Sequence, residues 1–165
     1  MRDENSEELG ENKNGKGGPA MKVKDIALKE VVCATPSTNM AEIASMMKRH
    51  NIGVIPVCEG QKLLGILTDR DLVITCMAAE MNPRECIARE FLTSNPVIIT
   101  PETDLKEAAE MMGKNQIRRL PVVESGNLVG MLSMGDVSMA LSDEDNMVAE
   151  MLRQISSPTH AAVSS

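Results

Sequence analysis

Apolar and polar residues follow each other along this chain in blocks whose period changes from two to about four and back. Short β-branched runs at residues 31–33 and 97–99 predict strands, and each run ends at a Thr-Pro pair that disfavours helical geometry. Apolar residues then recur at i, i+3, i+4 and i+7, which predicts an amphipathic helix in each block. We expect these positions to be buried: Met40, Ile43, Ala44 and Met47, and Leu105, Ala108, Ala109 and Met112.

A predicted hairpin follows each of these helices. The strands are expected at residues 54–58 and 63–68 and again at 119–123 and 128–133, with Gly60 and Gly126 in the intervening turns. A second helix is expected to start near Asp69 and near Met134. Each block is therefore a β-α-β-β-α unit.

The two blocks are copies of one repeat. A shift of 65 residues superposes residues 35–72 on 100–137 without a gap, with 15 identities in 38 positions. A unit of roughly 60 residues is marginal alone, so the two copies should share a core. We therefore predict an α/β (α+β) fold in which two tandem repeats pack as one module with a pseudo-two-fold axis.

Changes in composition along the chain suggest the boundaries between its tails, its two repeats and the linker. Polar residues 1–20 and 156–165 are expected to be disordered tails, and residues 21–80 and 86–142 form the two repeats. Residues 81–85, which contain the breaker pair Asn82-Pro83, form the linker. Residues 143–155 can form a C-terminal helix.

Charge and composition exclude several classes of partner. The chain of 165 residues has a net charge of -7, which argues against binding to nucleic acid, and one Phe with no Trp or Tyr leaves almost nothing to stack on bases. No apolar run approaches the roughly 18 residues of a membrane span, and the N-terminus is unlike a secretory signal. We expect a cytoplasmic protein that contacts no membrane.

Cysteine and histidine spacing gives no support to a metal site or a catalytic set. The four cysteines contain no C-x-x-C pair, and His50 and His160 match no zinc pattern, so the cysteines are interpreted as structural. No Cys-His or Ser-His-Asp arrangement is evident, which argues against an enzyme. Residues 10–17 imitate a phosphate-binding loop but end in Gly17, where Ser or Thr is required.

The residues that carry chemistry lie at the end of each hairpin. Thr68 and Ser133 close a glycine-containing strand, and Asp71 and Asp136 follow three residues later. This spacing is that of a capping box, which stabilises any helix start. It also places a hydroxyl group and a carboxylate at a helix N-terminus, where free amides favour phosphate and a nearby Asp can bind a ribose diol. Both interpretations stay open.

Arginines add a second indication of an anionic ligand. Arg118 and Arg119 come just before Leu120-Pro121-Val122 in the second copy, where the first copy has Gly53 and Val54. One guanidinium group can donate two parallel hydrogen bonds to phosphate oxygens. We therefore consider Arg118, Arg119 and, more weakly, Arg70 as phosphate contacts. The alternative is that they are ordinary surface arginines or form an ion pair with a neighbouring carboxylate.

The duplicated unit, with its Thr-Pro pair, its Ile-x-x-[Ile/Leu]-Pro-Val strand and its Gly-x-x-[Thr/Ser]-x-x-Asp ending, resembles the CBS domain pair, or Bateman module, of the stand-alone type. The resemblance implies that AMP, ADP, ATP or a related adenosyl ligand binds between the copies. It places Asp71 and Asp136 on ribose and Thr68 and Ser133 near phosphate. The side chains that it places around adenine are Val32, Ile55, Pro56, Val97, Leu120 and Pro121.

The predicted function is therefore a regulatory nucleotide sensor that needs no metal. The resemblance also implies a homodimer, and the response to ligand would reach a regulated protein of unknown identity as a change in repeat geometry. One alternative is an adaptor that kept the fold and lost nucleotide affinity. A nucleotide hydrolase is the least supported alternative.

Overall fold

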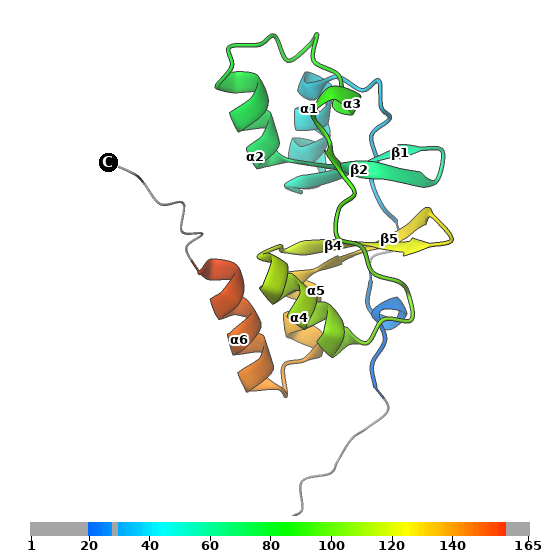
Figure 1. Cartoon of the computed structure of the whole chain (residues 1–165), viewed down its shortest axis with the longest axis vertical. Helices are drawn as coiled ribbons and strands as arrows, with labels where there is room; N and C mark the ends of the chain where they lie inside the picture. The colour runs from blue at the N-terminus through cyan, green and yellow to red at the C-terminus, as the bar shows by residue number, and fades with distance from the viewer. Residues whose placement is uncertain (1–19, 28–29, 158–165) are drawn as a thin grey trace, which may run out of the picture.

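The computed structural model describes residues 20–27 and 30–157, which form two stacked halves of mixed helix and strand (Figure 1). The first half contains α1 (Met40–His50), β1 (Val54–Glu59), β2 (Lys62–Thr68) and α2 (Asp69–Asp71), which continues as the π-helix η2 (Leu72–Met77). The second half contains α4 (Leu105–Asn115), β4 (Arg119–Glu124), β5 (Asn127–Ser133) and α5 (Met134–Ala140). The predicted α+β class and the repeat are confirmed.

The first helix of each half begins and ends at residues suited to those positions. The side chains of Asn39 and Asp104 accept hydrogen bonds from backbone N–H groups in the first turn. Asn51 and Gln116 end the helices in the left-handed conformation, with φ of 52° and 54°. Local sequence therefore sets the bounds of α1 and α4.

The buried faces of α1 and α4 differ at one predicted position. Seven of the eight predicted apolar residues are buried, but Ala44 is exposed whereas its counterpart Ala109 is buried. The prediction for Ala44 was wrong because burial of Ala109 depends on a further helix. Helix α6 (Asp145–Ser156) covers that face of α4, as Figure 1 shows, and no corresponding helix covers α1 among the described residues.

Each half has an antiparallel hairpin, and the two hairpins join into one sheet of order β1-β2-β5-β4. The hairpins meet near their turns, where Lys62 pairs with Asn127. Gly60 and Gly126 lie in these turns with φ of 60° and 83°, a conformation that suits glycine. The observed strands lie within one residue of the predicted ones.

The predicted opening strands are much shorter than expected. Residues 31–33 and 97–99 form no extended ladder. One parallel bridge joins Ala34, just after the first segment, to Val57, and another joins Ile99, at the end of the second, to Val122. The following Thr-Pro pair limits pairing, because proline has no N–H to donate. These segments still run beside β1 and β4.

The connection between the halves crosses closely over β2. Helix α3 (Ala88–Phe91), which the sequence pattern did not predict, leads into β3 (Thr93–Ser94), and β3 pairs with β2 at Gly65. A Cβ atom at Gly65 would lie 2.5 Å from the backbone oxygen of Thr93. Glycine at this position therefore permits the crossing.

Each half has its own hydrophobic core. Ile43, Ile55 and Leu67 are fully buried in the first, and Leu105 and Leu120 in the second. The turn η1 (Val23–Asp25) packs against the second half. Val23 is fully buried in the second core, and its N–H donates to the backbone oxygen of Thr103. The sequence placed this turn in the first repeat, because no local pattern reveals a contact with residues 80 positions away.

Helix α6 completes the second core. Its Met151 and Ile155 are buried, and a Cβ atom at Gly113 of α4 would contact the side chain of Gln154. This close approach allows the two helices to pack tightly.

The predicted tails, residues 1–20 and 156–165, lie almost entirely outside the described residues. Within the described part of the chain, none of the helices combines the length and the apolar character that crossing a bilayer requires.

Candidate functional site

The repeated hydroxyl and carboxylate pairs both form complete capping boxes. In the second half, the N–H and Oγ–H of Ser133 donate to Oδ2 of Asp136 at 2.9 and 2.6 Å, and the N–H of Asp136 donates to Oγ at 3.2 Å. Thr68 and Asp71 repeat these bonds at 2.8, 2.7 and 3.1 Å. Both motifs therefore have a structural role, and the question is which of them also borders a cavity.

A first cavity, of about 380 Å³, joins the two halves. The first half contributes mostly apolar side chains to its wall, and the second half contributes three polar groups and a methionine. Its lining consists of Glu30, Val31, Val32, His50, Ile52, Val54 and Pro56 from the first half and Arg119, Met131, Ser133 and Asp136 from the second. The structure thus brings together five predicted site residues: Val32, Pro56, Arg119, Ser133 and Asp136.

Strand parity decides which predicted apolar residues line this cavity. Val54 and Pro56 of β1 face it, so Ile55 points to the opposite side and is fully buried in the first core. Leu120, the counterpart of Ile55 in β4, is fully buried in the second core. Ile55 and Leu120 therefore contact neither cavity described here, and their assignment to the adenine pocket is corrected.

A second cavity, of about 650 Å³, occupies the corresponding position on the other side of the repeat axis. Three lining residues correspond in the repeat alignment: Ile52, Met131 and Ser133 of the first cavity are the counterparts of Ile117, Ile66 and Thr68 of the second. The full lining is Gly53, Val54, Ile66, Thr68, Asp69, Arg70, Gln116, Ile117, Arg118, Arg119, Ile155 and Ser157. It includes the predicted residues Thr68, Arg70, Arg118 and Arg119.

The two cavities are not equivalent. Asp71, Val97 and Pro121, which correspond to Asp136, Val32 and Pro56, do not line the second cavity. Ile155 and Ser157, at the end of α6, line it instead. In the first cavity the motif carboxylate Asp136 and the hydroxyl group of Ser133 face an apolar wall, whereas the carboxylate that lines the second cavity is Asp69 and not the motif residue Asp71.

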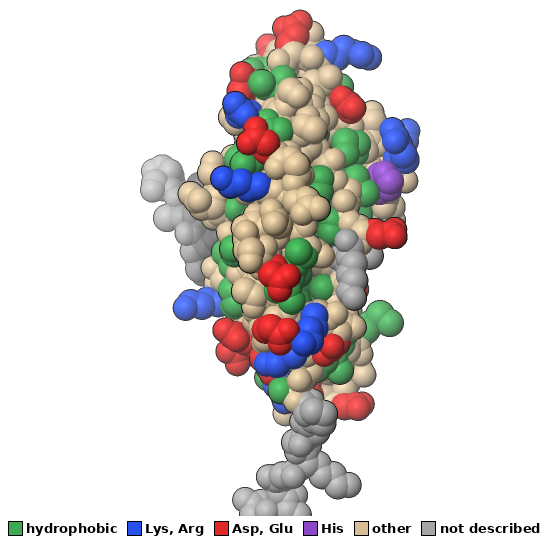
Figure 2. All heavy atoms as spheres, turned by 90° about the vertical axis from the view of Figure 1, so that its right-hand side faces the viewer, with side chains coloured by type: hydrophobic (Ala, Val, Ile, Leu, Met, Phe, Trp, Pro, Cys, Tyr) green, Lys and Arg blue, Asp and Glu red, His purple; other side chains and the backbone are tan. Residues whose placement is uncertain are grey.

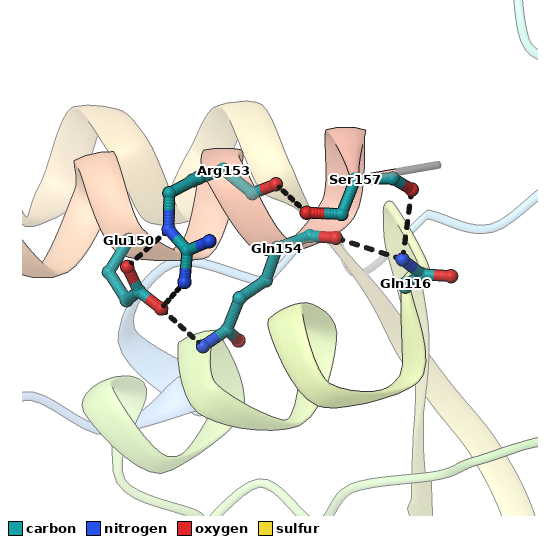
Figure 3. Close-up of polar contacts among 5 residues, drawn as sticks. All are labelled: Gln116, Glu150, Arg153, Gln154 and Ser157. Carbon is teal, nitrogen blue, oxygen red and sulfur yellow. Dashed lines mark hydrogen bonds and ion pairs between the residues drawn. The ribbon is translucent and has the colours of Figure 1, made fainter. Parts of the chain in front are cut away.

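Polar contacts hold the end of α6 beside the second cavity (Figure 3). Nε2 of Gln116 donates to the backbone oxygens of Gln154 and Ser157, at 3.1 and 3.0 Å. Arg153 forms two hydrogen bonds with Glu150 on the exposed side of the same helix, at 2.8 and 2.7 Å. These contacts fix the element that distinguishes the two halves.

Several lining residues were not predicted. Ile52 could have been found, because it is identical to Ile117 in the repeat and lies two residues before a lining strand residue. Glu30 and His50 carry no repeated signal, since their counterparts are Asn95 and Asn115. Only packing in three dimensions places these two ionisable groups at the first cavity.

On the face drawn in Figure 2, acidic and basic side chains are interspersed, and hydrophobic side chains are scattered between them. Among the described residues, no group of three or more His, Cys, Asp or Glu side chains is arranged to hold a metal ion.

The sequence matches the model of the CBS domain family twice, over residues 23–77 and 88–143. These matches cover more than half of the chain, and the order of elements in each half agrees with them. The chain belongs to the CBS domain family and carries two tandem CBS repeats.

Similar proteins share this arrangement. The CBS domain-containing protein YhcV of Bacillus subtilis is 38% identical over 117 residues, covering 71% of this chain and 83% of its own length. Hypoxic response protein 1 of Mycobacterium tuberculosis is 29% identical over 136 residues, covering 82% of this chain and 94% of its own length. The crystal structure of Hypoxic Response Protein I with two coordinated zinc ions is 30% identical to this chain, with a TM-score of 0.67, and the match covers 72% of this chain and 98% of the other.

The CBS domain pair of the protein MJ0100 was solved in complex with 5′-methylthioadenosine and S-adenosyl-L-methionine. It is 28% identical to this chain, with a TM-score of 0.66, and the match covers 76% of this chain and 99% of the other.

Proposed function

We propose that this protein is a regulatory module that binds one adenosyl ligand, such as AMP, ADP or ATP, in the first cavity. The observation that carries this proposal is the division of the cavity wall between an apolar half and a polar half. A purine nucleotide has the same division, since its base is flat and largely apolar whereas its ribose and phosphate are polar. A volume of about 380 Å³ lies within the usual range for small-molecule sites.

In this proposal adenine packs between the apolar side chains of Val32 and Pro56. The ribose hydroxyls donate to the carboxylate of Asp136, which accepts its hydrogen bonds from the described residues at Oδ2 and leaves Oδ1 for a ligand. Phosphate then lies within reach of Ser133 and Arg119, because a guanidinium group forms strong charge-assisted bonds with phosphate oxygens.

The proposed site contacts both repeats, and this position suits a regulatory role. A ligand held between two bodies changes their relative orientation when it binds one arrangement more tightly than another. The ligands of MJ0100, an adenosyl thioether and an adenosyl sulfonium, support adenosine as the shared element of recognition. No metal ion is required by the proposed contacts.

We also propose a homodimer as the unit that carries the signal. Exposed apolar side chains support it, because Val73, Ile74 and Met77 of η2 and Met139 of α5 have 49–81% of their surface accessible. Side chains of this size are normally buried when grouped, and a second copy would cover them. A regulated protein would then respond to the geometry of the dimer.

Titration calorimetry tests the proposed function directly, since the chain has no Trp or Tyr for fluorescence. The panel is AMP, ADP, ATP, 5′-methylthioadenosine and S-adenosylmethionine, with GMP as a control that changes only the base. We expect at least one adenosyl ligand to bind with a Kd below about 1 mM and near one molecule per chain. Absence of binding across the panel at millimolar concentration would reject the proposal and favour the adaptor alternative.

A further inference from the structure

Two cysteines that the proposed function does not use have neighbouring sulfur atoms in the first half. Sγ of Cys76, in η2, lies 3.9 Å from Sγ of Cys86, in the segment that follows linker residues 81–85. Neither residue lines the first or the second cavity. A disulfide bond has an S–S length of about 2.05 Å, so the two sulfurs need to approach each other by about 2 Å to bond. A displacement of this size is comparable with ordinary loop motion.

Backbone hydrogen bonds keep the two cysteines in neighbouring positions. The backbone oxygen of Cys76 accepts from the N–H of Met81 at 3.0 Å, and the backbone oxygen of Cys86 accepts from the N–H of Met40 at 2.9 Å. Met40 is the first residue of α1. The pair therefore lies where η2 and the start of α1 meet, and the fold itself holds the two thiols together.

The thiols are buried, but the segment that connects them is exposed. Cys76 and Cys86 have 1% and 3% of their surface accessible, whereas residues 77–85 are all exposed. Sγ of Cys76 is 3.7 Å from the backbone oxygen of Met81, so this segment passes beside the buried sulfur. Exposed turns of this kind open at a low cost in free energy. A reagent in solvent can therefore reach the pair when residues 77–85 open.

The environment of the pair makes its reaction slow. Burial, and then the contact with Cys76, raises the pKa of the Cys86 thiol. The thiolate form is the nucleophile in disulfide exchange, so both burial and a raised pKa reduce the rate. Cys33, which is exposed, provides the internal comparison for a thiol that needs no opening.

We propose that Cys76 and Cys86 form a redox switch in which a small disulfide, such as oxidised glutathione, converts the two thiols into a disulfide bond between η2 and the start of α1. The thiolate of one cysteine attacks the small disulfide, whose S–S bond breaks as a mixed disulfide forms and one thiolate leaves. The sulfur of the other cysteine then attacks the protein sulfur of the mixed disulfide and releases the second small thiol. The protein loses two electrons and two thiol protons, and the two released thiols take up both.

The disulfide would fasten the segment that carries part of the proposed dimer surface. Cys76 lies between Ile74 and Met77, whose side chains are exposed on η2. A bond to Cys86 closes a loop over residues 77–85, which restricts the unfolded chain and prevents that loop from opening widely. Oxidation should therefore raise the melting temperature by several degrees.

The test is a tryptic peptide map of the folded full chain after incubation with millimolar oxidised glutathione. Peptide 71–84, which contains Cys76, should be joined to peptide 85–89, which contains Cys86, and a reductant should separate them. Peptide 30–48, which contains Cys33, should carry glutathione as a mixed disulfide and should react first. The chain unfolded in guanidinium should instead give a mixture of links, because the fold no longer selects the pair.

Matched variants separate this pair from the other cysteines. Cys76→Ala and Cys86→Ala should each abolish the link and the rise in melting temperature, and circular dichroism checks that both variants fold. Cys33→Ser/Cys58→Ala should retain the link and the rise. These readouts do not depend on nucleotide binding, so they are independent of the proposed function.

Two results would overturn the proposal. One is that peptides 71–84 and 85–89 stay unlinked in the folded chain after Cys33 has reacted completely. The other is that the folded chain gives the same mixture of links as the unfolded chain.

Discussion

Asp136 and Ser133 bind each other through three hydrogen bonds, all of which involve one carboxylate oxygen or the serine hydroxyl group. The pair caps α5, and Thr68 with Asp71 caps α2 in the same way. Loss of either aspartate should therefore cost about the same stability, roughly 1 kcal/mol. Because Asp136 lines the first cavity and Asp71 lines neither cavity described here, Asp71 is a matched control for any ligand role of Asp136.

The two adjacent arginines should differ in their effect on phosphate binding. Arg119 lines the first cavity, whereas Arg118 lines only the second. We expect Arg119→Ala to lower the affinity for AMP at least about tenfold, since a hydrogen bond to a charged group contributes about 1.5–3 kcal/mol. Affinity for adenosine, which lacks phosphate, should change little.

Calorimetry with both ligands checks this difference, and Arg118→Ala serves as the control that should retain AMP affinity. Equal losses in the two variants would contradict the assignment of phosphate to the first cavity.

Helix α6 should contribute to stability but not to binding in the first cavity. Met151 has 3% of its surface accessible and lies in the second core, so Met151→Ala should lower the free energy of unfolding by about 2–4 kcal/mol. Leu152→Ala, at a neighbouring position with 37% exposure, should have a much smaller effect. Denaturant unfolding of both variants measures the difference, and an equal loss would show that α6 does not pack as described.

Acid should weaken the contact between Glu150 and Arg153. Hydrogen bonds from Arg153 and Gln154 lower the pKa of Glu150 from 4.5 to about 2. A depressed pKa means that the unfolded chain takes up the proton first, so the stabilisation is complete above about pH 4.5 and is lost as the pH falls towards 2. Both side chains are exposed, and the effect should therefore be small.

Melting temperatures of the wild type and of Glu150→Gln, measured between pH 6 and 2.5, test whether acid removes this stabilisation. The gap between the two melting temperatures should narrow as the pH falls from 6 to 2.5. A gap that widens on acidification would contradict the assignment.

The exposed apolar residues of η2 should determine association. Ile74 has 49% of its surface accessible, and a charged side chain there would lie in the proposed interface between two copies. We expect the wild type to sediment as a dimer and Ile74→Glu as a monomer with an unchanged circular dichroism spectrum. Lys48→Glu, an exposed change on α1, is the control. A wild type that sediments as a monomer at micromolar concentration would contradict the proposed homodimer.

Local sequence signals were sufficient for most of the fold. The repeat, the strand pattern and the turn glycines predicted two hairpins whose strands end within one residue of the observed bounds. The alternation of side chains in a strand should also have excluded Ile55 from a pocket that contains Pro56, because adjacent strand residues face opposite sides. That correction required no structure.

Other features depend on contacts between distant segments and leave no local signal. Val23 packs in the second core although it precedes the first repeat, and Ala109 is buried only because α6 covers it. The end of α6 also makes the second cavity unlike the first, which a repeat alignment cannot show.

The account depends most on Asp136 as a ligand for ribose. Calorimetric titration of AMP into the wild type, Asp136→Ala and Asp71→Ala tests this role, because each variant loses a capping box of the same kind, at α5 and at α2. We predict that Asp136→Ala lowers AMP affinity at least about tenfold and that Asp71→Ala retains it, with similar melting temperatures for the two variants. Equal affinities in all three proteins, or equal losses in the two variants, would contradict the proposed site.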